Sequence, residues 1–197
     1  YREAIALWTE ALAQTSEKKD LAVLYTNLGA ANRQVGDLTQ AIAQWEQAAK
    51  IYQSMADGKT RALLAQVLTE QAQAYSALGQ FRVAVPLLQT AVKLAQGERD
   101  PMTEAAAQGA LGNAYAAAGD FEQAIAAHRS SLELAATLNN PRLTCTALSN
   151  LGNVLNRRYK RYLFQASLAT REGDDLEEAR LSRLAQQDAA ATQSAYE

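Results

Sequence analysis

Four segments of the chain share one pattern of apolar and polar positions and align without a gap. Each is 20 residues long, begins with a large apolar side chain, has alanine three residues later and repeats apolar residues at the spacing of one helix face. Each ends on Asp or Asn, the residue types that cap the start of a following helix. The segments are 1–20, 38–57, 81–100 and 121–140. The pattern therefore predicts a helix in each segment and a second helix directly after it.

The intervening segments also resemble one another, because a small residue recurs seven positions before a turn position. The small residues are Gly29, Ala72, Gly112 and Gly152, and the turn positions are Gly36, Gly79, Gly119 and Tyr159. Seven residues are about two helical turns, so the small residue lets a neighbouring helix approach closely. A glycine at the turn position can adopt the left-handed conformation that ends a helix. The repeating unit is predicted to be a helix, a tight turn and a second helix.

This unit resembles the tetratricopeptide repeat family, in a longer form of about 40 residues. The resemblance is carried by small and aromatic residues at matching offsets: Leu28, Gly29, Gly36, Ala41, Trp45 and Ala48; Ala72, Tyr75, Gly79, Ala84, Leu88 and Ala91; and Leu111, Gly112, Tyr115, Gly119 and Ala124. It implies an all-α fold, a right-handed α-α superhelix (a solenoid) of antiparallel helix pairs. The single domain 1–197 then comprises the second helix of a truncated unit (1–20), three full units (21–57, 58–100 and 101–140) and a modified unit (141–197).

Two details of the repeat make further predictions. The first-helix segments of the full units, 21–37, 58–80 and 101–120, differ in length by steps of three residues, whereas the second-helix segments do not. We expect the first helices to differ by about one turn at their N-terminal ends. Trp8 and Trp45 occupy the same repeat position, which predicts that both are buried between adjacent units.

The last unit lacks the turn glycine, because Tyr159 stands in its place and no Gly or Pro follows until Gly173. We expect one extended helix from about 142 to about 172 and an inserted helical hairpin at about 160–188. Asp175 and Glu178 have the spacing of a capping box for the returning helix. The apolar residues expected to face one another across the hairpin are Tyr162, Phe164 and Leu168 with Leu176, Leu181 and Leu184.

The composition excludes several classes of function. With 19 Lys and Arg against 21 Asp and Glu, no global field attracts nucleic acid or an anionic membrane, and neither is expected as a partner. No apolar stretch reaches the roughly 18 residues of a membrane span, so we expect a soluble chain. One Cys and one His exclude an intramolecular disulfide and a structural zinc site, and neither a metal nor another cofactor is expected.

Three features could carry catalysis, and each has a simpler explanation. His128 shares the repeat position of Trp45 and has no motif-spaced nucleophile or carboxylate, which favours a packing role. Cys145 has no identifiable base, which favours an inert thiol. The Gly-rich stretch 109–119 lacks the preceding strand and following Lys-Ser/Thr of a phosphate loop. No catalytic residue is assigned, and the chain is not expected to be an enzyme.

In the family the first helices line a concave face, and small and amide side chains dominate the matching positions of this chain. Such groups can hydrogen-bond an extended peptide backbone and leave room for it. The matching positions are Val23, Thr26, Ala30 and Arg33; Gln66, Thr69, Gln73 and Ser76; Ala106, Gly109, Asn113 and Ala116; and Thr146, Ser149, Asn153 and Asn156. The residues assigned to a peptide-binding groove are Thr26, Ala30, Arg33, Thr69, Gln73, Ser76, Asn113, Ser149, Asn153 and Asn156. An unoccupied, solvated face is the alternative.

A second candidate surface is a basic cluster at the base of the predicted hairpin, made of Arg157, Arg158, Lys160 and Arg161. In an antiparallel hairpin the acidic residues near the tip do not reach this cluster, and only Asp188 lies about opposite. The cluster is expected to stay unpaired and to contact an acidic partner or a neighbouring domain. A plain solvated face is again the alternative.

We interpret the chain as a non-catalytic scaffold that binds a protein or peptide. One alternative is the regulatory or substrate-recruiting arm of a larger CHAT-type peptidase, because the modified last unit is similar to repeats that precede such domains in bacterial proteins. The other is a structural element that self-associates through exposed end helices. The chain opens and stops within its repeat pattern, which suggests a fragment of a larger protein. Its compartment is unknown, with the cytoplasm slightly favoured.

Overall fold

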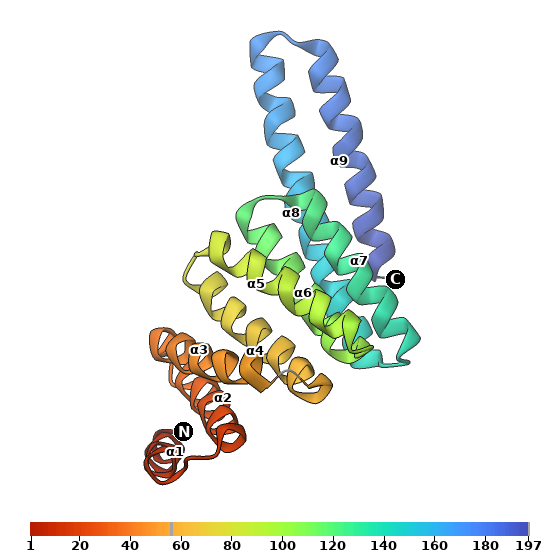
Figure 1. Ribbon diagram of the computed structural model, residues 1–197. Coiled ribbons are helices and arrows are strands. Elements are labelled where there is room, and N and C mark those ends of the chain that lie inside the picture. Colours follow the sequence, from red (N-terminus) through yellow and green to blue (C-terminus); the bar gives the residue numbers. More distant parts are fainter. Residues whose placement is uncertain (56, 197) are drawn as a thin grey trace.

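The computed structural model describes residues 1–55 and 57–196, which form nine α-helices and no strand (Figure 1). The helices are α1 (Arg2–Gln14), α2 (Lys18–Gln34), α3 (Leu38–Met55), α4 (Gly58–Ala77), α5 (Phe81–Gly97), α6 (Pro101–Ala118), α7 (Phe121–Thr137), α8 (Pro141–Glu172) and α9 (Asp175–Tyr196). Each helix packs against the next along the chain, α4 also contacts α2 and α6, and α6 contacts α8. The even-numbered helices therefore form an inner layer, and the expected all-α solenoid of helix pairs is confirmed.

Polar residues at the ends of the repeated segments cap the helices that follow. The side chains of Asp57, Asp100 and Asn140 accept hydrogen bonds from the backbone N–H three residues on, at 2.8, 3.1 and 3.2 Å. These caps confirm the prediction for three of the four segments. The prediction is wrong for Asp20, which lies inside α2.

The first helix boundary lies earlier than expected, between Gln14 and Lys18. Thr15 there has an extended backbone, with φ −107° and ψ 131°. Thr and Ser side chains compete for backbone hydrogen bonds and favour helix ends over helix interiors, and Thr15 is followed by Ser16. The second helix of the truncated unit therefore ends at Gln14 rather than at residue 20.

The turn glycines adopt the backbone that their positions require. Gly36, Gly79 and Gly119 have φ of 87°, 74° and 86°, a left-handed conformation that other residues rarely adopt. Tyr159, at the corresponding position of the last unit, lies in the middle of α8 instead. Inside the helix pairs, a glycine at this position ends the first helix, and its replacement by Tyr159 lets α8 continue, as predicted.

The predicted differences in first-helix length hold for one helix only. α4 has 20 residues, against 17 in α2 and 18 in α6, and the extra residues lie at its N-terminal end. α2 and α6 begin equally far ahead of Gly29 and Gly112, because α2 includes three residues that the repeat alignment assigns to the preceding helix.

Large rings and small residues are paired in the core of successive units. Trp45 is 0% exposed, and a Cβ atom added at Gly29 would lie 2.5 Å from its Nε1. His128 is likewise fully buried, and a Cβ added at Gly112 would lie 2.6 Å from its Cε1. In the unit between them, Ala72 and Leu88 occupy these two repeat positions. Each ring therefore requires a glycine on the facing helix, whereas a leucine tolerates alanine.

The expected burial of Trp45 is confirmed, but that of Trp8 is wrong, because Trp8 is only half-buried. α1 contains no buried residue. Within the described chain α2 is the one helix that contacts α1, so nothing covers the other side of the indole.

Burial makes His128 a source of acid sensitivity. Loss of hydration lowers its pKa from 6.5 to about 4, and neither ring nitrogen has a hydrogen-bond partner in the described part of the chain. The unfolded chain therefore binds a proton more readily than the folded chain as the pH falls below about 6.5. We expect the unfolding free energy to drop by about 2 kcal/mol between pH 7 and pH 5. Urea denaturation at the two pH values measures this, and the drop should largely disappear in His128→Leu.

The last unit forms the expected projecting hairpin. α8 is a single helix of 32 residues, and α9 returns antiparallel to it. The hairpin that they form projects beyond the other helices (Figure 1). Gly173 ends α8 with φ 75°. The cap differs by one residue from the prediction: Asp174, not Asp175, accepts the hydrogen bond from the Glu177 N–H, at 3.0 Å.

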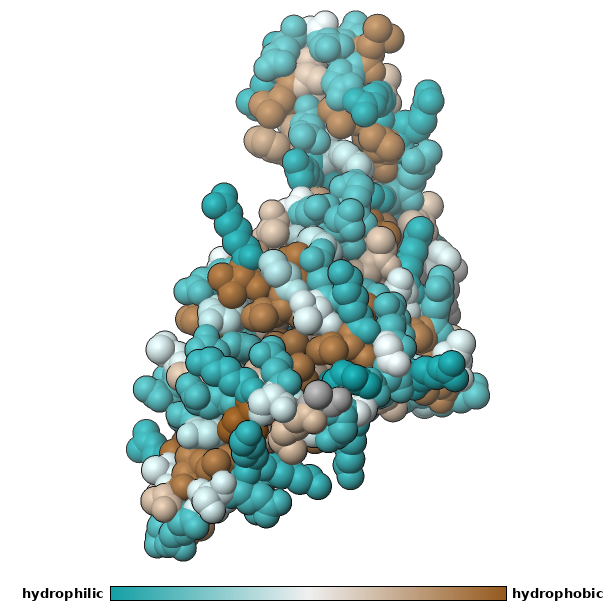
Figure 2. Space-filling view, in the orientation of Figure 1, coloured by the Kyte–Doolittle hydropathy of each residue, from teal (hydrophilic) through white to brown (hydrophobic). Residues whose placement is uncertain are grey.

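The apolar residues that close the hairpin are only partly the ones expected, because Leu181 is buried as predicted and Tyr162 and Leu184 are half-buried. Ala166 and Ala169 on α8, and Leu181 and Ala185 on α9, are buried, whereas Phe164 is 64% exposed and Leu168 and Leu176 are also exposed. The buried residues Leu151 and Leu155 define the side of α8 that faces the core. Phe164 lies nine residues after Leu155, which places it about half a turn away from that side. Apolar side chains consequently lie on the surface of the hairpin (Figure 2).

Candidate functional site

The inner helices line a groove made of three adjacent hollows. The first lies between α2 and α4, with a volume of about 330 Å³, and the second between α4 and α6, with about 240 Å³. The third lies between α4, α6 and α8, with about 460 Å³. Gln66 and Glu70 line both the first and the second hollow, and Gln73 and Ala106 line both the second and the third. The hollows therefore follow one another along the inner layer.

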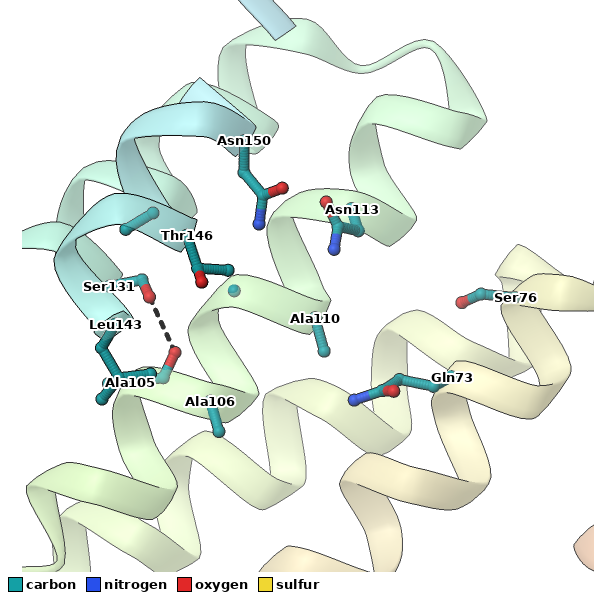
Figure 3. Close-up of a pocket in the computed structure, with 12 residues that line it drawn as sticks. Gln73, Ser76, Ala105, Ala106, Ala110, Asn113, Ser131, Leu143, Thr146 and Asn150 are labelled. Atoms are coloured by element: carbon teal, nitrogen blue, oxygen red, sulfur yellow. Dashed lines mark hydrogen bonds between the residues drawn. The ribbon is translucent and has the colours of Figure 1, made fainter. Parts of the chain in front are cut away.

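The third hollow has a floor of small residues and a rim of uncharged polar groups (Figure 3). Its lining residues are Gln73, Ser76, Ala105, Ala106, Gly109, Ala110, Asn113, Ser131, Leu143, Thr146, Ala147 and Asn150. None of these side chains is charged. Asn113 of α6 and Asn150 of α8 extend toward the cavity from opposite sides in Figure 3.

Some polar groups of this hollow are engaged within the protein, and one is not. The Ser131 hydroxyl donates to the Ala105 carbonyl at 2.8 Å, and the Thr146 hydroxyl donates to the Arg142 carbonyl at 2.9 Å. The Ser76 hydroxyl oxygen is buried and has no hydrogen-bond partner among the described residues. It is therefore an unsatisfied polar atom in the wall of the hollow.

The first hollow contains the charged residues of the groove. Nη1 of Arg33 lies 2.6 Å from Oε2 of Glu70, and the guanidinium lies 5.9 Å from the centre of the Trp45 ring. Trp45, Tyr52 and Val67 supply an apolar wall. Because the two charges neutralise each other, the groove carries no net charge along the hollows.

Most predicted groove residues lie in the hollows, but those on α8 do not. Thr26, Ala30 and Arg33 line the first hollow, Thr69 and Gln73 the second, and Gln73, Ser76 and Asn113 the third. Gln66, Ala106, Gly109 and Thr146, at matching repeat positions, also line the hollows. Val23, Ala116, Ser149, Asn153 and Asn156 do not line any of the three.

The face of α8 that lines the groove is turned toward α6. This face of α8 consists of Leu143, Thr146, Ala147 and Asn150. The repeat alignment placed Ser149 on the groove and missed Asn150. Sequence reasoning also missed Glu70, whose role depends on Arg33 of another helix. A carboxylate next to groove positions that include the cation Arg33 was the available signal.

The basic cluster is mostly engaged within the protein, so the expectation that it stays unpaired is wrong. Arg158 donates from Nε and Nη2 to the two carboxylate oxygens of Asp188, at 2.8 and 2.6 Å, and from Nη1 to Glu122 at 3.0 Å. The hydrogen bonds to Asp188 hold the pKa of Arg158 above its ordinary value. Asp188 was expected opposite the cluster, whereas Glu122 comes from α7, 36 residues earlier.

Two other cations of the cluster lie against the turn that precedes α7. Arg161 donates to the Gly119 carbonyl at 3.1 Å, and its guanidinium lies 5.7 Å from the centre of the Phe121 ring. Arg157 lies 5.5 Å from the same ring. These contacts, with the Arg158 ion pairs, fasten the base of the hairpin to the preceding unit.

The remaining candidates for chemistry have packing or surface positions. His128 lies in the core, Cys145 is exposed near the start of α8, and the Gly-rich stretch 109–119 lies mostly within α6. The described residues contain no cluster of three His, Cys, Asp or Glu that could hold a metal ion. No helix in the described part of the chain is long and apolar enough to cross a membrane.

The described fold is shared with solved structures. BtubC (BKLC) from P. vanneervenii aligns with a TM-score of 0.69 and 21% identity over 98% of this chain and 74% of that protein. The apo form of RapI aligns with a TM-score of 0.69 and 8% identity over 96% of this chain and 70% of that protein. Aspartyl phosphate phosphatase F from Bacillus subtilis aligns with a TM-score of 0.66 and 15% identity over 94% of this chain and 51% of that protein. At these identities the likeness concerns the fold alone.

Family models identify the repeats themselves. Models described as tetratricopeptide repeat match residues 20–97 and 107–142, which include the helix pairs whose glycines and rings are described above. No curated protein matches the chain in sequence. The chain belongs to the tetratricopeptide repeat family.

Proposed function

We propose that the chain is a non-catalytic scaffold that binds an extended peptide, or an extended segment of a protein, along the groove of α2, α4, α6 and α8. The observation that carries the proposal is the succession of three adjacent hollows, which share lining residues from each to the next. An extended chain advances about 3.3 Å per residue, so a row of hollows across four helices accommodates several residues in one pass.

The side chains of the groove suit binding better than catalysis. Amide and hydroxyl groups can pair with the N–H and C=O groups of a peptide backbone. The three hollows are lined by no His or Cys, and their one carboxylate, on Glu70, is paired with Arg33. Nothing in the groove therefore supplies an activated nucleophile or a free general base.

Filling the junction of two hollows tests this function. Ala106 is exposed and lines both the second and the third hollow, so Ala106→Trp should block the groove without disturbing the core. Phage displaying random 12-residue peptides are selected on the immobilised chain, and the enriched peptides are synthesised for fluorescence polarisation. We expect Ala106→Trp to weaken their binding at least about tenfold, because a ring in the groove overlaps the peptide.

The matched control is Ala126→Trp, at an exposed position of the outer helix α7. This variant adds the same ring away from the groove and should bind the peptides as the wild type does. If selection enriches no peptide, or if the enriched peptides bind Ala106→Trp normally, the proposed function is wrong.

A further inference from the structure

The packing around Gly109 does not require a glycine at this position. A Cβ added there would meet the Ser131 hydroxyl oxygen at 3.5 Å, an ordinary van der Waals contact. The same addition at Gly29 or Gly112 would overlap a buried ring. Glycine in a helix interior also destabilises a helix relative to alanine. The absence of a side chain at Gly109 thus deepens the floor of the third hollow at the expense of helix stability.

The chemistry around Gly109 is neutral. The third hollow is lined without a charged residue, and the Arg33–Glu70 pair borders it, because Nη1 of Arg33 lies 3.5 Å from Oε1 of the lining residue Gln73. A charged group of a ligand would lose water here and meet only two charges that already neutralise each other, which is unfavourable. The amides of Asn113 and Asn150 can instead replace water around neutral groups.

We propose that the third hollow selects an uncharged stretch of the bound peptide and holds a small side chain, Gly, Ala or Ser, over Gly109. This inference rests on the proposed function, because it specifies which peptides the groove accepts. The selectivity has two sources. The peptide backbone can enter the hollow over Gly109 only if the peptide residue there has a small side chain. The neutral lining disfavours Asp, Glu, Lys and Arg.

The test uses the peptides enriched by phage display on the wild-type chain. They should share an uncharged stretch that contains a small residue, and replacing that residue by Lys or by Asp should weaken binding at least about tenfold. Gly109→Leu should weaken the parent peptides to a similar degree, because its side chain fills the hollow. Gly97→Leu is the matched control, since Gly97 is exposed at the end of α5 with open space around its Cβ position.

Gly109→Ala separates a loss of binding from a loss of folding. Alanine favours the helix, so this variant should melt at a higher temperature than the wild type while binding the peptides more weakly. A merely structural glycine would lower stability and binding together. Unfolding is therefore excluded as the cause of a binding defect.

The outcomes distinguish this inference from the function on which it rests. If peptides lose affinity for Ala106→Trp but not for Gly109→Leu, the groove binds peptides and the assignment of the third hollow is wrong. The same conclusion follows if the essential residue of the enriched peptides is charged or large. If Ala106→Trp has no effect, the proposed function itself fails, and this inference fails with it.

Discussion

Replacing Trp45 with alanine is expected to lower the unfolding free energy by about 3–5 kcal/mol. The indole is 0% exposed and packs directly on Gly29 of α2, the other helix of its unit. Its removal both forfeits the burial of a large apolar surface and leaves a cavity that rigid helices fill poorly. Urea denaturation followed by circular dichroism measures the loss.

Trp8→Ala is the matched control, because Trp8 occupies the same repeat position but is only half-buried on α1. The same substitution should cost less than half as much there. Equal losses at the two positions would mean that repeat position, rather than burial between units, sets the contribution.

The pairing of ring and glycine can be tested by exchange. Gly29→Ala should destabilise the chain by about 1–3 kcal/mol, because its Cβ overlaps the Trp45 ring. The double variant Gly29→Ala with Trp45→Leu recreates the Ala72 and Leu88 combination of the next unit. It should be more stable than the sum of the two single losses predicts, which is the signature of coupled neighbours.

Much of the fold could be predicted because the decisive signals are local. Gly36, Gly79 and Gly119 end helices through their own backbone, and Asp57 and Asp100 cap helices through neighbours three residues away. Where the signal was local but weaker, the prediction failed. The break after Gln14 depends on Thr15 and Ser16, which the repeat alignment left inside a helix.

The groove was predicted in part, because its residues follow the repeat until the repeat changes. On α4 and α6 the matching positions include Gln73 and Asn113, which line the hollows. On α8 the groove face is set by the neighbouring α6, which brings in Asn150 in place of Ser149.

The prediction for the basic cluster was wrong for a related reason, because the partners of its arginines are remote in sequence. Asp188 was predicted to lie about opposite, but Glu122 and the Gly119 carbonyl lie on segments more than 30 residues earlier. No spacing rule within one helix pair identifies such contacts. They follow only from the way in which the extended helix α8 passes the end of α6 and the start of α7.

Asp188→Ala is expected to lower the unfolding free energy by about 3 kcal/mol. Asp188 is 3% exposed and accepts two hydrogen bonds from Arg158. Without the carboxylate, a largely buried guanidinium keeps only Glu122, whose side chain is exposed and therefore well screened by solvent. Urea denaturation measures the total loss, and hydrogen exchange should show faster opening of α9 than of α4 or α6.

Glu177→Ala provides the comparison, because it removes a carboxylate from the exposed Arg180–Glu177 pair on the same helix. That change should stay below about 0.5 kcal/mol. The double variant Arg158→Met with Asp188→Leu should lie much closer to the wild type than Asp188→Ala does, since it removes both charges and refills the volume. If Asp188→Ala were as mild as Glu177→Ala, the ion pair would contribute little, and the buried residues Ala166, Ala169, Leu181 and Ala185 would account for the closure of the hairpin.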